Sequence, residues 1–578
     1  MKIFYNSTFL ALLIIFTLSL FALKDLLKSG FYTSHDGETH TARIAQYYIA
    51  LKDGQIPPRF AGSFYNGLGS PIFVYIYPLP YILGSILHFS GFSFVNSFKM
   101  IMALGFIFSG VFSYIWLKEL YRDQKAALIG ALFYEWSPYR LQLIYVRGSI
   151  SEHLAYTFLP LALFSITRLI NFYSRKWLAI SSLFIAFILL SQNLVALLSI
   201  PVIIFYSILI SISKNNFKPT ILTLIAITWG LVISAFTYIP AIFERNLIRF
   251  DEAFNLVYNS HFITLMQIIR SPWGYGFDLP GTVNDMMSFQ MGLAHLLILS
   301  LTIILLIYLF IKKGKKIFLY SEEFSKNNLV IILVLFALSV AIFLTIETNI
   351  TKFVWKNITL LHLIDIPWRF LGVMPIFVAV IAAFFMKKTK FGLIFIFLIF
   401  ALIFANRNHI RINKSLFYTD EHFLTYTGTA TQFSEFSPTS RNSTSIPYFT
   451  NKDLAVNTAS GWVVYTNINS NSRKITFNAD VISDEAQIRI NKFFFPKIII
   501  LQDNQKLVEG KDFRSHSEKS IRLDSTKDTN GFIYVTLKKG NHYLEMKYVD
   551  TYIRKVANIT SLFALCLALI IVFTKNRR

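Results

Sequence analysis

The sequence is poor in cysteine and in charged side chains. Its single cysteine, Cys566, falls inside the last apolar run, which excludes a disulfide framework and a cysteine metal site. Only 15% of the 578 residues are charged, whereas 54% are hydrophobic and 16% aromatic. The mean hydropathy is +0.51. These values exclude an ordinary soluble protein and indicate a polytopic membrane protein.

Acidic residues are also scarce, because 32 Asp and Glu stand against 55 Lys and Arg and give a formal charge of +23. The basic residues occur in short clusters between apolar runs, where orientation in a membrane explains them. We therefore exclude nucleic acid as a partner. No small-residue cleavage site follows the apolar core of residues 1–27, so we predict a transmembrane helix there and no signal peptide.

Apolar runs occur throughout the first 405 residues and again at the end of the chain. Residues 71–90 are ambiguous, since they are apolar but rich in proline and tyrosine. Counting them as a juxtamembrane or re-entrant segment places all the basic loops in the cytoplasm. This predicts about twelve spans with both termini cytoplasmic. The spans lie near residues 8–27, 98–117, 126–138, 154–172, 177–193, 195–213, 219–239, 291–311, 328–346, 368–386, 391–405 and 556–574.

Polar loops at 28–97, 139–153, 240–290 and 347–367 would then face outward, as would a soluble domain at 406–555. In that domain, alternating apolar residues at 475–481 and 486–491 predict half-buried strands. Two apolar stretches flank Lys539-Gly540-Asn541 and predict a hairpin. The expected architecture is a multi-pass helical domain at 1–405, an extracytoplasmic β-sandwich-like or jelly-roll-like domain at 406–555, and a final transmembrane helix with a basic cytoplasmic tail at 556–578.

An ionisable cluster follows the first span directly. Asp36 is a plausible helix N-cap, and His40 and Arg43 follow at i+4 and i+7, on one helix face. The pattern predicts a helix lying on the membrane surface with this polar face open to water. Asp53-Gly54 would end it. N-capping alone is the plainer explanation of Asp36.

Other ionisable groups stand at the edges of spans, where they are costly to bury and often functional. Arg147 and Glu152 are close enough in sequence to pair. The arginines have a plainer explanation as side chains that reach lipid headgroups, and His153 as a satisfied interfacial histidine. The remaining candidates are Arg140, His153, Arg369 and the SPWGYG segment with Ser288 and Gln290.

Several ordered motifs together carry a family resemblance. They are HDGETHTARIAQYYIALKDGQIPPRF, NGLGSPIFVYIYPLPYILG, SPYRLQLIYVRGSISEHLA, SPWGYG with MSFQMG, and PWRFL. With them the chain resembles the membrane-protein family labelled "6-pyruvoyl-tetrahydropterin synthase-related", a neighbour of the YfhO-like proteins. The resemblance runs through most of the chain, including NKFFFPKIIILQDNQKL near its end.

The resemblance implies a GT-C type architecture, as in glycosyltransferases that use polyprenyl-phosphate sugars. By this resemblance Asp36 matches the first-loop catalytic carboxylate and Glu152 lies near a second-loop acidic position. His40 would assist catalysis. The positively charged side chains that would bind the departing phosphate are Arg43, Arg140, Arg147 and Arg369, with His153 beside them.

The expected activity is sugar transfer, at the outer face of the plasma membrane, from a lipid-phosphate-linked donor to a glycopolymer, lipid or protein. Membrane lipids, the polyprenyl-phosphate sugar and this acceptor are the expected partners. The sequence has no DxD motif or other clear pair of metal ligands. A divalent cation stays open, and we assign no other cofactor. One alternative is a lipid or polysaccharide transporter or flippase, which would need ionisable groups deep within spans. Another is a glycan-binding membrane scaffold.

Overall fold

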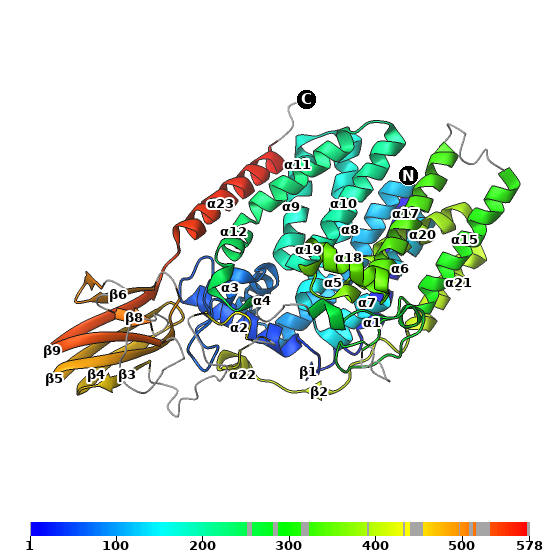
Figure 1. The fold of residues 1–578 in the computed structure, drawn as a ribbon. Coiled ribbons are helices and arrows are strands. Elements are labelled where there is room, and N and C mark those ends of the chain that lie inside the picture. The colour runs from blue at the N-terminus through cyan, green and yellow to red at the C-terminus, as the bar shows by residue number, and fades with distance from the viewer. Residues whose placement is uncertain are drawn as a thin grey trace.

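The computed structural model describes most of the chain, in two parts: a helical body and a β domain that projects from one end of it (Figure 1). The described residues are 2–250, 257–280, 287–313, 323–389, 392–429, 431, 434–439, 455–495, 498–507, 513–515 and 532–574. Basic residues of the predicted cytoplasmic loops at 315–316 and 575–578 lie outside these ranges.

Within the described ranges, six helices are long and apolar enough to cross a membrane. A seventh span results if α11 (Lys218–Ile233) and α12 (Ala235–Phe243), which are bent by 73° at their junction, are counted as one. The chain is therefore a polytopic helical membrane protein. The six are α5 (Phe94–Tyr121), α8 (Ile150–Phe172), α10 (Asn193–Lys214), α15 (Leu293–Lys313), α20 (Met374–Thr389) with the preceding turn η4 (Pro367–Gly372), and α23 (Tyr552–Phe573).

Some of the other apolar helices are short because polar residues and proline end them. The helix α6 has 12 residues, or about 18 Å, and ends before Ser137-Pro138, where Ser137 caps the next helix. The helix α4 has 11 residues, or about 16 Å, and cannot cross a bilayer of about 30 Å alone. The prediction that residues 71–90 do not cross is consistent with this length, whereas α6 is too short for the span predicted at 126–138. The other apolar helices are α1 (Lys2–Leu23), α4 (Leu79–Phe89), α6 (Gln124–Glu135), α9 (Arg175–Ser191), α17 (Glu323–Thr345) and α21 (Gly392–Asn406).

Short helices gather at one end of the body, where Figure 1 shows α2, α22 and the strands β1 and β2 close together. The strand β1 pairs with β2, which joins the first loop to a segment almost 400 residues later in the chain. The elements at this end are β1 (Phe31–Tyr32), α2 (Gly37–Lys52), α3 (Ile72–Tyr75), α7 (Pro138–Gln142), the π-helix η1 (Leu143–Arg147), α14 (Leu265–Ile269), α18 (Asn349–Asn357), α19 (Thr359–His362), β2 (Ser415–Leu416) and α22 (Asp420–Leu424), with the 3-10 turns η2 (Arg245–Leu247) and η3 (Val257–Ser260).

The β domain is a seven-stranded antiparallel sheet in the order β3-β5-β9-β6-β7, with β4 also on β5 and β8 also on β9. Its register shifts between Val481 and Glu485 of β5. Buried side chains on both sides of this shift belong to one core, so the sheet folds over on itself. The strands are β3 (Val456–Ser460), β4 (Val463–Ser470), β5 (Lys474–Phe493), β6 (Ile498–Gln502), β7 (Gln505–Lys506), β8 (Phe513–Ser515) and β9 (Phe532–Tyr548).

The predicted hairpin at Lys539-Gly540-Asn541 is wrong. Both flanking stretches belong to the single strand β9, and Gly540 lies opposite Val481 of β5 with φ +128°. The glycine therefore accommodates the bend of a long strand, a conformation that side chains with a Cβ rarely adopt. The two predicted strands at 475–481 and 486–491 are likewise two halves of β5.

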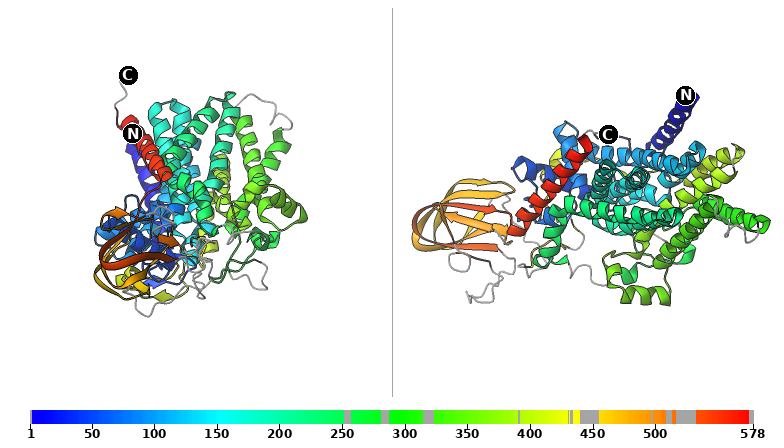
Figure 2. Two further views of the ribbon diagram at one scale, coloured as in Figure 1. Left: turned by 60° about the vertical axis from the view of Figure 1, so that its left-hand side comes forward. Right: turned by 90° about the horizontal axis from the view of Figure 1, so that it is seen from above.

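A cluster of ion pairs joins the last helix to the rest of the protein; we call Arg59, Glu244, Asp550 and Arg554 the stem cluster. Arg554 donates to one oxygen of Glu244 from Nε at 2.9 Å and from Nη2 at 2.7 Å, and Thr551 donates to the other oxygen at 2.7 Å. Arg59 Nε lies 3.9 Å from Asp550 Oδ1. This cluster fixes α23, and with it the β domain, which Figure 2 shows at the side of the helical body.

Candidate active site

The first loop and the second loop meet at the N-terminus of α2. The backbone N–H groups of His35 and Asp36 donate to the carbonyls of Val146 and Arg147 at 3.1 and 2.8 Å. Gly148 makes this approach feasible: its φ is +60°, and a Cβ there would lie 2.5 Å from Ser34 Oγ and 2.9 Å from Gly37 N. Only glycine fits such a contact without strain. The turn therefore sets Asp36 beside Arg147.

Asp36 is at the N-cap position of α2, as predicted, but its side chain makes no capping hydrogen bond. Its carboxylate is 44% exposed and lies 4.0 Å from Arg147 Nη2. The Asp36 side chain therefore does not cap the helix, which was the plainer explanation of this residue. An anion at this place is also favoured by the positive end of the helix dipole.

Arg147 connects Asp36 to a buried network. Its Nη1 donates to Glu152 Oε2 at 2.8 Å, which confirms the pair that the sequence spacing predicts. Burial lowers the pKa of Arg147, but Glu152, Tyr139 and Asp36 together outweigh burial, and the pKa is raised. Tyr139 donates to the same Glu152 oxygen at 3.0 Å. Arg147 is thus a fixed cation between two carboxylates.

Arg369 closes the network from the other side, across 217 residues of sequence. It donates to Glu152 Oε1 from Nη1 and to Asp365 Oδ1 from Nε at 2.8 Å. Burial raises the pKa of Asp365, and Arg369 opposes that rise. We call these five side chains the outer-face cluster, after the loops that the sequence predicts to face outward: Asp36, Arg147, Glu152, Asp365 and Arg369. Sequence reasoning missed Asp365, although its position four residues before Arg369 was a usable signal.

The polar face of α2 differs from the prediction. His40 and Arg43 are 3% and 8% exposed, because α4 covers them, and the predicted surface helix with an open polar face is wrong. Tyr81 of α4 lies 3.1 Å from His40 Nδ1 and accepts from Arg43 Nη1 at 3.4 Å. Burial, and then the charges of Arg43 and Arg147, lower the pKa of His40 well below its ordinary value. The His40 ring is therefore neutral and contacts Tyr81 instead of the Asp36 side chain.

Arg140 and His153 lie inside the helical body, and both are 0% exposed. Arg140 donates to the His153 carbonyl at 2.8 Å and to Thr157 Oγ1 at 3.2 Å. The His153 ring contacts the Met102 carbonyl at 3.0 Å. A phosphate would have to displace these contacts to reach Arg140.

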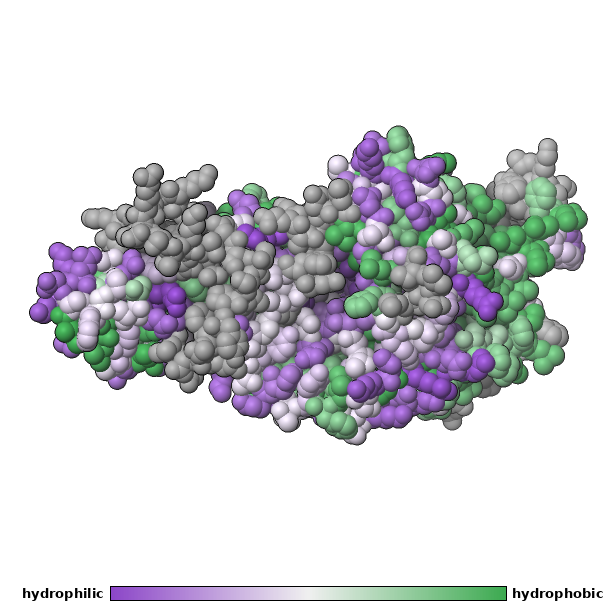
Figure 3. Space-filling model, turned by 60° about the horizontal axis from the view of Figure 1, so that its bottom comes forward, coloured by the Kyte–Doolittle hydropathy of each residue, from purple (hydrophilic) through white to green (hydrophobic). Residues whose placement is uncertain are grey.

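The segment after α21, predicted as the start of the β domain, instead contacts α2. Tyr418 donates to Glu38 Oε2 at 2.9 Å, and His422 of α22 lies 3.1 Å from Glu38 Oε1. Both side chains come from residues more than 370 positions away in sequence, so no local pattern could reveal them. Figure 3 shows that the face carrying these elements is largely hydrophilic, whereas hydrophobic surface gathers over the helices at its right.

The SPWGYG segment lies beside the first loop. The His35 ring contacts the Gly276 carbonyl at 2.7 Å, and Trp273 stacks on His409 with ring centroids 4.2 Å apart. Ser288 donates to the Ser271 carbonyl at 3.0 Å. The segment thus supports the first loop through the Gly276 carbonyl and packs against His409 through Trp273.

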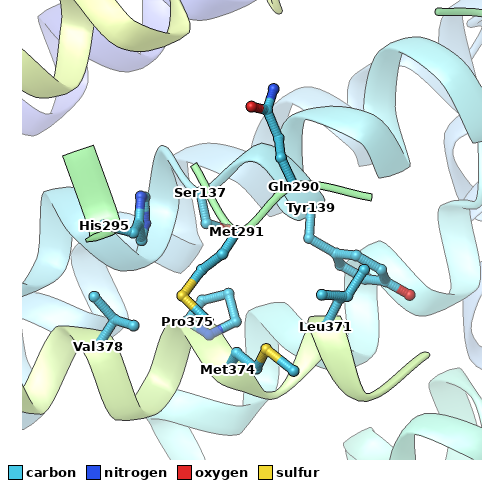
Figure 4. A pocket seen from close by; sticks show the side chains of 9 residues that line it. All are labelled: Ser137, Tyr139, Gln290, Met291, His295, Leu371, Met374, Pro375 and Val378. Atoms are coloured by element: carbon cyan, nitrogen blue, oxygen red, sulfur yellow. The ribbon is translucent and has the colours of Figure 1, made fainter. Parts of the chain in front are cut away.

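A small void lies behind Tyr139 (Figure 4). Its volume is about 10 Å³, roughly the space of one water, so it cannot hold a sugar. Figure 4 shows the Tyr139 hydroxyl pointing away from the middle of this void. The nine lining residues are Ser137, Tyr139, Gln290, Met291, His295, Leu371, Met374, Pro375 and Val378.

Within the described part of the chain, no group of three or more His, Cys, Asp or Glu side chains is placed to hold a metal ion. The outer-face cluster pairs its carboxylates with arginines instead. The negative charge of its carboxylates is therefore balanced mainly by the guanidinium groups of Arg147 and Arg369.

Comparison with known proteins identifies the sequence family. Residues 73–412 match the model described as "6-pyruvoyl-tetrahydropterin synthase related domain; membrane protein". An uncharacterized protein of Lactococcus lactis subsp. cremoris is 25% identical over 244 residues, which are 41% of this chain and 39% of that protein.

Some similarity to solved structures is also found. The apo oligosaccharyltransferase of Archaeoglobus fulgidus aligns with a TM-score of 0.40 and 14% identity, over 72% of this chain and 56% of that one. ArnT of Cupriavidus metallidurans, bound to undecaprenyl phosphate, aligns with a TM-score of 0.32 and 13% identity, over 67% and 60%. The chain spans less than two thirds of each of these relatives, and the TM-scores lie below the level that establishes a common fold.

Proposed function

The chain belongs to the 6-pyruvoyl-tetrahydropterin synthase related family of membrane proteins, and from this starting point we propose that it is a GT-C type membrane glycosyltransferase. It would move a sugar from a polyprenyl-phosphate donor to an extracytoplasmic acceptor such as a glycopolymer, lipid or protein. One observation carries the proposal: a half-exposed carboxylate, Asp36, lies beside a buried arginine that is bonded to Glu152, in an apolar helical protein.

The geometry fits a proton acceptor at a membrane edge. Asp36 is the exposed end of the outer-face cluster, and Arg147 and Glu152 behind it are about 5% and 1% exposed. Its carboxylate is therefore reachable from outside while its position is set by groups that do not move freely. A general base needs this combination of access and fixed geometry.

In the proposed reaction the negative charge of Asp36 and the positive charge of Arg147 have different roles. Asp36 takes the proton of an acceptor hydroxyl, whose oxygen forms a bond to the anomeric carbon of the donor sugar. The bond from that carbon to the phosphate oxygen breaks, and the lipid phosphate leaves with the electron pair. Arg147 Nη2, which faces Asp36, and the first backbone N–H groups of α2 are the nearest positive groups for the departing phosphate.

A second line of support comes from the basic ends of the helices. Arg122, Lys214 and Lys387, near the C-terminal ends of α5, α10 and α20, line one cavity. The other end of the body carries Asp36. If the basic end is cytoplasmic, the outer-face cluster and the β domain are extracytoplasmic. We therefore propose a plasma-membrane topology with both termini inside.

The β domain is attached at the C-terminal end of α2, about 24 Å along this helix from Asp36. Ser472 donates its backbone N–H to Asp53 at the C-terminal end of α2 at 2.8 Å and accepts from Gln55 at 2.8 Å. Lys492 donates to the carbonyls of Gly62 and Gly67 at 3.2 and 2.6 Å, and burial lowers its pKa to about 8. We propose that the domain binds the acceptor or covers the site.

The two alternatives fit the geometry less well. A scaffold without catalysis would leave Asp36 and Glu152 in separate regions, whereas Arg147 contacts both. A transporter would have ionisable groups near the middle of spans, whereas Glu152 lies in the first turn of α8.

The test is sugar transfer by the full-length protein in proteoliposomes supplied with a panel of polyprenyl-phosphate hexoses. Asp36→Asn should lower transfer at least a hundredfold, because general acid–base catalysis contributes about 10²–10⁴-fold. Glu347→Gln is the matched control, since Glu347 is 50% exposed and also forms one ion pair, with Lys352 at 2.6 Å. Transfer by Asp36→Asn at the control's rate would refute the assignment of Asp36, and donors left intact by the wild-type protein would refute the proposed reaction.

A further inference from the structure

A cavity of about 410 Å³ lies far from the outer-face cluster, at the other end of the helical body. The helix α8 gives the separation: Glu152 is in its first turn, and Asn171, 19 residues later, lines the cavity. At 1.5 Å per residue the two are about 28 Å apart along the helix. Figure 1 shows α11 reaching this end of the body, away from β1, β2 and α22.

The inner part of the cavity is apolar. Side chains of α8, α10, α17 and α20 form its wall, and the volume falls within the range of sites that bind small molecules, about 300–1,000 Å³. Leu163, Val202, Phe205, Leu209, Val334 and Phe377 are representative. Such a wall accommodates a hydrocarbon chain and offers little to a sugar or a nucleotide.

The mouth of the cavity is basic. Arg122, Lys214 and Lys387 line it, and in the described ranges none of them forms an ion pair with a carboxylate. Lys214 donates to the Ile170 carbonyl at 3.3 Å, and Lys387 lies over the Tyr121 ring at 5.8 Å. The one acidic lining residue, Glu119, is already paired with Arg168 at 3.3 Å. The mouth therefore carries uncompensated positive charge.

We propose that this cavity binds an anionic phospholipid, with the phosphate at the three basic side chains and an acyl chain along the apolar wall. The cavity is complementary to such a lipid. Its basic mouth matches the anionic headgroup, and its apolar inner wall matches the acyl chain. A zwitterionic lipid would bring its own cation to the basic mouth and would bind less well. The site is separate from the outer-face cluster, and the proposal does not depend on glycosyl transfer.

The experiment is native mass spectrometry of the full-length protein purified in detergent, with phosphatidylglycerol and phosphatidylcholine added in equal amounts. We expect phosphatidylglycerol to remain bound preferentially. The double variant Lys214→Gln/Lys387→Gln should weaken this binding at least tenfold, since each basic residue near a lipid headgroup contributes about 1 kcal/mol, or about fivefold. Equal retention of the two lipids by the wild-type protein would overturn the proposal.

The control is Arg175→Gln/Lys176→Gln, which removes two positive charges at the start of α9, outside the cavity lining. This variant should bind phosphatidylglycerol like the wild type. A second test variant, Leu209→Trp, fills the cavity without changing its charge and should also expel the lipid. If both test variants retain phosphatidylglycerol as the control does, the cavity is not the lipid site. Thermal unfolding checks that all variants are folded.

Discussion

The outer-face cluster and the stem cluster are built from the same side chains but end differently. Each has a buried arginine about 4 Å from a partly exposed aspartate: Arg147 and Asp36 at 4.0 Å, Arg59 and Asp550 at 3.9 Å. Each also has a buried glutamate bonded to arginine at 2.8 or 2.7 Å. Ion pairing alone therefore does not distinguish a structural cluster from a candidate active site.

The exposed ends of the two clusters make the difference. In the stem cluster Asn558 donates to Asp550 at 3.1 Å, and Asp550 is 25% exposed. Asp36 is 44% exposed and has no capping bond. The stem cluster is thus closed by a further hydrogen bond, whereas the outer-face cluster ends in a carboxylate that is accessible from outside. A polar group that the fold positions but leaves without a full set of hydrogen bonds is therefore the better candidate for a functional group.

The largest effect is expected from Glu152→Gln. Removing this charge leaves Arg147 and Arg369 buried and facing each other, and breaking a buried pair typically costs about 3–5 kcal/mol of unfolding free energy. Transfer should also fall, because Arg147 is no longer held beside Asp36. Thermal unfolding followed by tryptophan fluorescence, together with turnover per folded molecule, measures both. Wild-type values for both would show that the network is dispensable.

Glu244→Gln in the stem cluster should lower the unfolding free energy by about 3 kcal/mol, the lower end of that range. The loss is smaller because only one arginine, Arg554, loses its carboxylate partner. Turnover per folded molecule should stay at the wild-type level. The same two assays apply. A loss of turnover as large as that of Glu152→Gln would erase the distinction between the clusters.

Gly148→Ala should destabilise the protein by more than about 1–2 kcal/mol, because the clash of the new Cβ adds to the cost of the left-handed conformation. Its effect on transfer should be disproportionate, since the new methyl group would push apart the loops that carry Asp36 and Arg147. Gly91→Ala is the control, because Gly91 also has positive φ, +99°, but open space around its Cβ position. Equal transfer by the two variants would contradict the role of the close contact.

The smallest effect concerns pH. His40 has a folded-state pKa well below its ordinary 6.5, chiefly through burial, so the folded protein binds fewer protons than the unfolded chain below pH 6.5. Stability from His40 is complete above pH 6.5 and falls by at most about 1.4 kcal/mol per pH unit below it. Hydrogen exchange at pH 7.5 and 5.5 should show α2 losing protection before α23. His40→Asn should remove this difference, and its persistence would exclude His40 as the cause.

Local patterns predicted part of the fold and of the site. The Asp36 cap position, the Arg147–Glu152 pair and the strand alternation in β5 follow from neighbours in sequence, and the structure has all three. The Lys539-Gly540-Asn541 turn failed because glycine permits a bend within a strand as readily as a hairpin.

Long-range packing decided the rest. No periodicity shows that α4 covers His40 and Arg43, or that Arg369 reaches Glu152 across 217 residues. The burial of arginine depends on which carboxylate the fold supplies, and that partner is distant in sequence. Arg140 and Arg369 looked alike as arginines near span ends, yet one is bonded to a carbonyl and a hydroxyl and the other to two carboxylates.

The most direct measurement of the central claim is chemical rescue at Asp36. Turnover of the polyprenyl-phosphate donor would be compared for Asp36→Ala and Asp550→Ala, each with and without added formate, in the same proteoliposomes. The account predicts that Asp36→Ala loses at least a hundredfold and regains part of this with formate, which replaces the missing base, while Asp550→Ala stays active. Wild-type turnover by Asp36→Ala without formate would contradict it.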